Sequence, residues 1–217
     1  MHIEEMFIFL MHALQSIYKE IGMPKNYYPE ETANYDTRSE KAGSKAKTLD
    51  RVAKAAYDNN RAYEGCARCV LHALQTHLNM TDDQRAFTAA FKSSTALSAG
   101  VARKGETCGA LIGALMAIGL EKGTESLGDF EGYVDTMGAA SCVFDRFKEK
   151  YGTVKCFEIQ EQLFGRKIDF FKEEDAEWWY RNGGLDKCPG VCGVAARLAA
   201  EEIFKVREEM DKIKAPN

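Results

Sequence analysis

The stretch TCGALIGALMAIGLEKG, residues 107–123, is an apolar run with a helix start and a helix stop at its two ends. Thr107 is suited to cap the first turn, because a threonine hydroxyl can accept a hydrogen bond from the backbone there. Gly123 marks the end, since glycine commonly terminates a helix. The stretch therefore predicts a helix from Cys108 to about Lys122.

The same predicted helix carries a face of small residues. Gly109 and Gly113 lie one turn apart on it, and alanines flank them. A glycine inside a helix costs roughly 1 kcal/mol relative to alanine, so these glycines indicate close approach by another helix or by a cofactor. Tight packing of helices is enough to explain the pattern, but Cys108 at the head of the face favours a cofactor.

Working outward from this stretch, apolar residues recur at helical spacing along nearly all of the chain, and no alternating strand pattern extends beyond a few residues. We therefore expect an all-α fold, a compact multi-helix bundle with an additional N-terminal helix and arm. Thr81 and Gln84 predict a capping box, and Pro189 predicts the first position of the last helix. The other predicted helices cover about residues 3–21, 48–78 with a break near Asn59, 129–150, 156–163 and 173–181.

The length of 217 residues suits one domain with an appended segment. We assign residues 1–47 to an N-terminal helix and arm, and residues 48–217 to a cysteine-bearing helical domain. The N-terminal helix has a full apolar stripe, which must be buried on the domain or on a partner. Because the arm is long enough to reach across to a second copy, we expect a homodimer.

Charge and hydropathy argue against nucleic acid and membrane as binding partners. The chain has 33 acidic and 29 basic side chains and a net charge of −4, whereas nucleic-acid binding usually requires a strongly basic surface. The apolar run from Met6 to Met11 follows Glu4 and Glu5, where a signal peptide carries positive charge, and it is far too short to span a bilayer. We expect a cytoplasmic protein without membrane insertion and without nucleic acid.

The cysteines are the unusual feature. In a reducing cytoplasm, clustered cysteines indicate metal binding or redox chemistry rather than a disulfide framework. Free cysteines are often small buried hydrophobic residues, and that explanation suits two or three of them, Cys142 above all. It does not explain the spacing of three in one pair and of four in another, which places both sulfurs of a pair on one helix face. The seven are Cys66, Cys69, Cys108, Cys142, Cys156, Cys188 and Cys192.

Two of the cysteines are predicted to lie at helix starts. Cys108 follows the capping residue of its helix, and Cys188 directly precedes Pro189. The backbone N–H groups and the dipole of a first helical turn favour negative charge, which lowers the pKa of a thiol. Thiolate is the form that binds metals and attacks disulfides, so the sequence places Cys108, Cys188 and also Cys192 for reactivity.

Four stretches carry a resemblance to a known family. The chain resembles the C_GCAxxG_C_C family of redox-active proteins, which includes the split-Soret type of cytochrome. The second stretch is the most specific, although its Cys108-Gly109-Ala110 transposes the first two letters of the family pattern. The stretches occur in order within residues 50–205: GCARCVL at 65–71, GETCGALIG at 105–113, YGTVKC at 151–156 followed by LFGR at 163–166, and KCPGVCGVAA at 187–196.

The resemblance implies a redox-active protein that holds an iron–sulfur cluster. Cys69 and Cys192 are additional to the family pattern, and each lies one turn after a family cysteine, where it would support a larger cluster, a second cluster or ligand exchange. Val70 stands where a CxxCH attachment site has histidine, which excludes covalent c-type haem at this position. The family's own cysteines match Cys66, Cys108, Cys156 and Cys188.

The leading hypothesis is therefore an iron–sulfur protein that transfers electrons, as a carrier or an oxidoreductase, to an unknown partner protein, with the four family cysteines as ligands. One alternative is a metal-free thiol–disulfide oxidoreductase that uses Cys66 with Cys69 or Cys188 with Cys192. A second is a structural zinc site of four cysteines. A shared site requires the four family cysteines to converge, although they are far apart in the chain.

A histidine and two tryptophans are also candidates for the site, but packing roles suit them better. His72 lies three residues after Cys69 on the same predicted face, but imidazole seldom replaces cysteine as a cluster ligand. We therefore interpret His72 mainly as a packing residue. Trp178 and Trp179 are expected to pack a helix end or a dimer contact.

Overall fold

The structure is a computed structural model that describes the backbone of residues 42–214 and the side chains of residues 45–212. The chain divides into two units, Met1–Asn34 and Tyr35–Asn217, and the described residues all belong to the second. The predicted helix at residues 3–21 and the predicted arm up to residue 41 lie outside the described residues.

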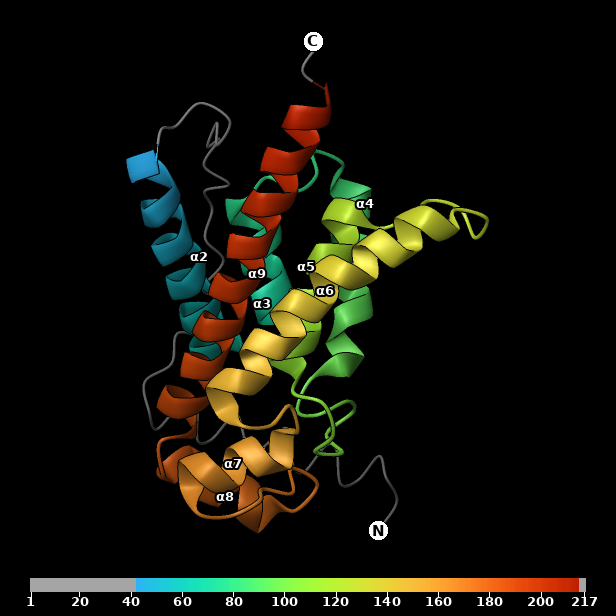
Figure 1. The fold of residues 1–217 in the computed structure, drawn as a ribbon. Coiled ribbons are helices and arrows are strands. Elements are labelled where there is room, and N and C mark those ends of the chain that lie inside the picture. The colour runs from blue at the N-terminus through green and yellow to red at the C-terminus, as the bar shows by residue number, and fades with distance from the viewer. Residues whose placement is uncertain (1–41, 215–217) are drawn as a thin grey trace. The chain divides into compact units, whose positions relative to one another are not determined.

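The prediction of an all-α fold is confirmed (Figure 1). Within residues 42–214 the only pairing of strand type is one antiparallel bridge, between Thr107 and Lys155. The elements are α2 (Ala42–Tyr63), α3 (Cys66–His77), α4 (Gln84–Ser94), the short 3-10 helix η1 (Thr95–Leu97), α5 (Gly109–Lys122), α6 (Phe130–Tyr151), α7 (Cys156–Phe164), α8 (Glu173–Arg181) and α9 (Gly184–Lys214).

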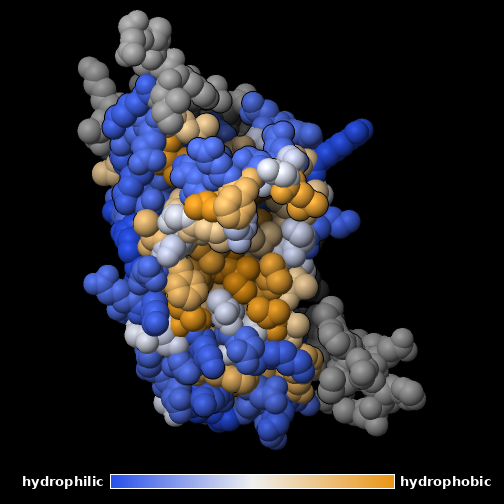
Figure 2. All heavy atoms as spheres, turned by 45° about the vertical axis from the view of Figure 1, so that its right-hand side comes forward, coloured by the Kyte–Doolittle hydropathy of each residue, from blue (hydrophilic) through white to orange (hydrophobic). Residues whose placement is uncertain are grey.

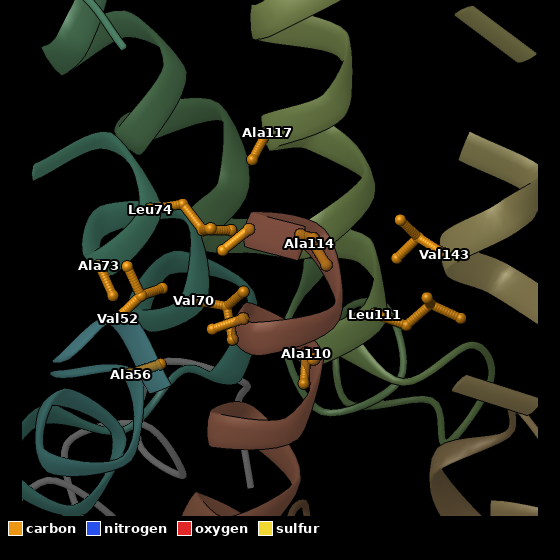
Figure 3. Packing of buried hydrophobic residues seen from close by; sticks show 14 of the residues in the cluster. Val52, Ala56, Val70, Ala73, Leu74, Ala110, Leu111, Ala114, Ala117 and Val143 are labelled. Carbon is orange, nitrogen blue, oxygen red and sulfur yellow. The ribbon is translucent and has the colours of Figure 1, made fainter. Parts of the chain in front are cut away.

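The long C-terminal helix α9 forms the centre of the bundle and packs against α2, α3, α5 and α6. Small side chains on α9 allow its neighbours to approach closely. In Figure 3, Val52 and Val70 come from α2 and α3 on one side of the core, and Val143 comes from α6 on the other. The fully buried alanines of α9 are Ala195, Ala196, Ala199 and Ala200.

The small-residue face of α5 packs against α3. A Cβ atom at Gly113 would overlap the carbonyl oxygen of Ala67, so the two helix backbones touch at this point. Ala110 and Ala114 on the same part of α5 are fully buried. Of the two explanations for the small residues, close approach by another helix therefore applies at Gly113.

Several predicted helix boundaries were wrong. Helix α2 begins at Ala42 rather than near Thr48 and continues through Asn59. The break falls at Glu64 and Gly65, which have positive φ angles of 54° and 78°. A left-handed backbone cannot continue a right-handed helix, so α3 starts afresh at the next residue.

The caps of α4 and α5 also differ from the prediction. Asp83, not Thr81, caps α4, because its carboxylate accepts from the N–H of Arg85 at 2.7 Å. The hydroxyl of Thr81 accepts from the N–H of Asp83 instead, at 3.1 Å. Cys108 is itself the N-cap of α5, one residue later than predicted.

Helix α9 begins five residues before Pro189, which lies inside it. The carbonyl group of Gly183 accepts from the N–H groups of Asp186 and Lys187, at 3.1 Å and 3.0 Å. A first turn thus forms upstream of the proline, and Pro189 lacks the N–H that would donate to the carbonyl of Leu185. As a result, Cys188 lies in the second turn of α9 rather than at its cap.

None of the helices in residues 42–214 is both long and apolar enough to cross a bilayer. On the side of the bundle that carries α4 and α6, hydrophobic residues gather at the surface (Figure 2). The start of α6 contributes the exposed side chains of Phe130, Tyr133, Val134 and Met137. Exposed apolar patches of this kind often mark protein–protein contacts.

Candidate functional site

Three cysteines of the family pattern lie where helices begin. Cys66 is the first residue of α3, Cys156 is the first residue of α7, and Cys108 is the N-cap of α5. Cys188 lies near the start of α9. The unpaired N–H groups and the dipole at each helix start favour negative charge on a nearby sulfur.

The segments that carry Cys108 and Cys156 run side by side. The N–H of Cys108 donates to the carbonyl of Val154 at 2.8 Å, and the N–H of Cys156 donates to the carbonyl of Glu106 at 2.6 Å. These bonds flank the bridge between Thr107 and Lys155. Two cysteines 48 positions apart in the sequence are thus fixed next to each other by backbone pairing.

The pKa values of three family thiols depend on other members of the set. Burial raises the pKa of the Cys156 thiol, and Cys108, Cys66 and Cys188 raise it further. Burial likewise raises the pKa of Cys108, with contributions from Cys66 and Cys188. The pKa of Cys188 is raised to about 12, by burial and then by Cys66. Geometry places three of them side by side, because backbone hydrogen bonds pair the segments of Cys108 and Cys156 and the sulfur of Cys66 lies against Gly109. Cys188 is near enough to raise the pKa of Cys108 and Cys156.

The two additional cysteines belong to the same group. Cys192 is fully buried, and its pKa is raised by burial and then by Cys66, Cys69, Cys108 and Cys188. Burial raises the pKa of Cys69 to about 12, and its thiol donates to the carbonyl of Glu64 at 2.9 Å. We call these residues the six-thiol group: Cys66, Cys69, Cys108, Cys156, Cys188 and Cys192.

Cys142 stands apart from this group. It is exposed on α6, so its prediction as a buried hydrophobic residue was wrong. The buried face of α6 is formed by Thr136, Ala139, Val143 and Phe147, at helical spacing. Cys142 lies about 100° around the helix from Val143 and so faces away from the core.

Hydrogen-bond donors surround two of the sulfurs. The N–H of Ala99 donates to the sulfur of Cys66 at 3.5 Å. Burial raises the pKa of Cys66, whereas Ala99 and the Ser98 side chain lower it. At Cys108, the N–H groups of Ala110 and Leu111 lower the pKa against the effect of burial. Such donors favour sulfur that carries negative charge.

An unusual backbone segment supplies the donor at Cys66. Residues 99–103 all have positive φ angles, between 50° and 73°, and only Gly100 among them is a glycine. A left-handed conformation costs roughly 1–2 kcal/mol for each residue with a Cβ atom. Gly109 leaves room for the sulfur of Cys66, because a Cβ atom at Gly109 would lie 2.5 Å from that sulfur. Strain of this kind typically accumulates at functional sites.

Sequence reasoning missed two residues of the site. Burial raises the pKa of Tyr151, and Cys108, Cys192 and Cys188 raise it further. Trp179, expected to pack a helix end or a dimer contact, is buried, and its side chain lowers the pKa of Cys188 against the effect of burial. No spacing in the sequence indicated either role: Tyr151 is the last residue of α6, and Trp179 comes from α8, which carries no cysteine.

His72 lies elsewhere. Its Nδ1 atom is 3.5 Å from the side-chain nitrogen of Asn59, and its ring packs edge-on against Phe87 and Phe91. Burial lowers its pKa, which keeps it neutral. Its surroundings are those of a packing residue, as the sequence indicated.

The described side chains include no group of three or more His, Cys, Asp or Glu residues that could hold a metal ion as they stand. The chemistry of the six-thiol group nevertheless fits an iron–sulfur cluster, which is held by thiolates. Two observations of the structure support the fit. Helix starts and N–H donors favour anionic sulfur at the site, and the buried Trp179 nitrogen and Ser98 hydroxyl have no hydrogen-bond partner of normal geometry.

The described part of the chain is thus an all-α bundle in which three cysteines stand at helix starts, two of them buried. Residues 64–202 match a family described as "Putative redox-active protein (C_GCAxxG_C_C)". The match covers more than half of the chain and includes the whole six-thiol group, so the chain belongs to this family, and the resemblance drawn from the four stretches is confirmed. No curated protein and no solved structure matches the chain.

Proposed function

We propose that this protein binds an iron–sulfur cluster through Cys66, Cys108, Cys156 and Cys188 and transfers electrons. The observation that carries the proposal is the proximity of cysteines from different helices: backbone hydrogen bonds pair the segments of Cys108 and Cys156, the sulfur of Cys66 lies against Gly109, and Cys188 is near enough to raise the pKa of Cys108 and Cys156. Four cysteines that only filled the core would have no reason to meet. Four thiolates are also the common ligand set of such clusters.

The protein's own residues would hold the cluster by charge and by shape. Without a cofactor the raised pKa values keep the thiols protonated at neutral pH. Ligation would require loss of those protons, because thiolate is the binding form, and the helix starts would stabilise the negative sulfurs. The bound group supplies a centre that accepts and releases an electron. Burial of Cys108 and Cys156 excludes water from the site.

The pKa values argue against the metal-free dithiol alternative. A catalytic thiol needs a lowered pKa, because only the thiolate attacks a disulfide. Burial instead raises the pKa to about 12 at both Cys69 and Cys188, one in each proposed pair. These thiols would be weak nucleophiles at neutral pH. The zinc alternative needs the same cysteines as the cluster and is separated from it by metal analysis.

Anaerobically purified protein is expected to be coloured and to contain iron and acid-labile sulfide in comparable amounts. Its visible absorption should decrease on reduction, because the cluster absorbs through charge transfer from sulfur to iron. Metal and sulfide analysis with a visible spectrum is the measurement. Colourless protein with zinc would support the structural site, and colourless metal-free protein with thiols that titrate after reduction would support the dithiol.

Cys69→Ala and Cys192→Ala are expected to change the cluster without removing it. Each thiol lies one turn after a proposed ligand, and Cys66, Cys108 and Cys188 raise the pKa of Cys192. Loss of either should shift the visible spectrum or speed the loss of colour in air, while iron per protein remains near the wild-type value. Complete loss of iron in either variant would instead make that residue a ligand.

We further propose a cytoplasmic location and a partner protein that exchanges electrons with the site. All seven cysteines are free in the structure, and Cys142 is exposed, which suits a reducing compartment. Cys66 and Cys188 are only partly buried. A partner would therefore approach the site most closely at these two residues.

A further inference from the structure

The indole ring of Trp179 is fixed in place at the edge of the six-thiol group. Trp179 is only 5% exposed. Its ring lies against Gly184, where a Cβ atom would overlap it. Phe170 and Tyr180 pack edge-on to it, with ring centroids at 5.4 Å and 5.1 Å. The ring therefore has little freedom to turn its nitrogen elsewhere.

The nitrogen of this ring is an unsatisfied donor. Nε1 of Trp179 is buried and makes no hydrogen bond of normal geometry to any described residue. A buried donor without a partner costs about 1–3 kcal/mol, so its position calls for an explanation. Gly184, against which the ring lies, is one turn before Cys188 on the same face of α9, so the sulfur of Cys188 is the acceptor next to the ring. A neutral thiol is a weak acceptor, whereas an anionic sulfur is a strong one.

A second unsatisfied donor lies at Cys66. The hydroxyl oxygen of Ser98 is buried and has no hydrogen-bond partner of normal geometry among the described residues. Ser98 precedes the left-handed segment at residues 99–103, whose first N–H donates to the sulfur of Cys66. Two buried donors on different elements thus face two sulfurs of the same group.

We propose that Trp179 and Ser98 donate hydrogen bonds to the sulfurs of Cys188 and Cys66 in the cluster-bound protein and thereby raise its reduction potential. The inference rests on the proposed function. Reduction adds negative charge that spreads onto the sulfurs. Donors aimed at them therefore stabilise the reduced form more than the oxidised form.

Trp179→Phe tests this, because phenylalanine keeps an aromatic ring and removes the N–H. The matched control is Trp178→Phe on the same helix, whose ring packs against Phe164 and Arg166 rather than the thiols. Iron content and the midpoint potential, from a redox titration followed by visible absorption, are measured for both. We expect unchanged iron in both and a more negative potential for Trp179→Phe only. A tenfold loss of stabilisation of the reduced form corresponds to about 59 mV for one electron.

Ser98→Ala provides a second test that disturbs the core less. Its control is Ser93→Ala, since Ser93 is exposed and its hydroxyl donates to the carbonyl of Ala90 at 2.8 Å. We expect a shift in the same direction for Ser98→Ala and none for Ser93→Ala. Iron-loaded Ser98→Ala with the wild-type potential would overturn the inference at Cys66, and the same result for Trp179→Phe would overturn it at Cys188. Wild-type protein without iron and sulfide would overturn the proposed function itself.

Discussion

Replacing Cys108 with serine is expected to abolish iron binding. The residue caps α5, is buried, and interacts with Cys66, Cys156 and Cys188. A serine oxygen is a poorer ligand than thiolate sulfur for the iron of such clusters. The N–H groups that favour an anion at this position cannot compensate, because a serine hydroxyl does not ionise near neutral pH. Iron per protein after anaerobic purification is the measurement, and it should fall to background.

Cys142→Ala is the matched control for that loss. Cys142 is exposed on α6 and has no part in the six-thiol group, so this variant should keep the wild-type iron content and spectrum. Both variants need the wild-type helix content by circular dichroism, which separates loss of the site from loss of the fold. Retention of iron by Cys108→Ser together with its loss in Cys142→Ala would refute the ligand assignment. Equal tolerance of both substitutions would indicate cysteines that only pack the core.

The contrast between these two cysteines shows how far the sequence predicts the site. Cys108 was predicted within one residue of its place at a helix start, because a polar residue before an apolar run and the glycine that ends the helix are local signals. Cys142 was taken to be buried because of its apolar neighbours in the sequence. Burial depends on which face of α6 meets α5 and α9, and that choice is made by the packing of other helices.

The convergence of the thiols followed from the resemblance, but the contacts that produce it did not. The bridge between Thr107 and Lys155 joins segments 48 positions apart and has no alternating pattern to reveal it. The left-handed segment at residues 99–103 contains ordinary residues that seldom adopt this conformation. Its strain must be offset by contacts made elsewhere in the fold, and a local reading of the sequence contains no such information.

The start of α9 is another position that the local sequence did not predict. Proline favours the first position of a helix, so the prediction began the helix at Pro189. The carbonyl of Gly183 starts the turn earlier. Trp179 then packs on Gly184 and covers the new start. A strong local signal was thus outweighed by tertiary packing around Cys188.

Gly113→Ala is expected to destabilise the protein strongly for a change of one methyl group. The added Cβ would overlap the carbonyl oxygen of Ala67 on α3, and a backbone atom inside a helix cannot move aside as a side chain can. Overpacking of a core costs about 1–3 kcal/mol, which should exceed the gain of roughly 1 kcal/mol that alanine brings to a helix. The free energy of unfolding, from urea denaturation of the metal-free protein, should fall by about 1–2 kcal/mol.

Gly119→Ala is the matched control, because Gly119 lies on the same helix and a Cβ there would meet nothing within 4 Å. Because only the helix preference of alanine over glycine changes, this variant should be as stable as the wild type or up to about 1 kcal/mol more stable. Gly113→Ala should also lose affinity for iron, since α3 must shift and carries Cys66 with it, whereas Gly119→Ala should not. If both variants gained stability equally, α3 and α5 would not touch at Gly113. The small-residue face would then be open to the cofactor that the sequence first indicated.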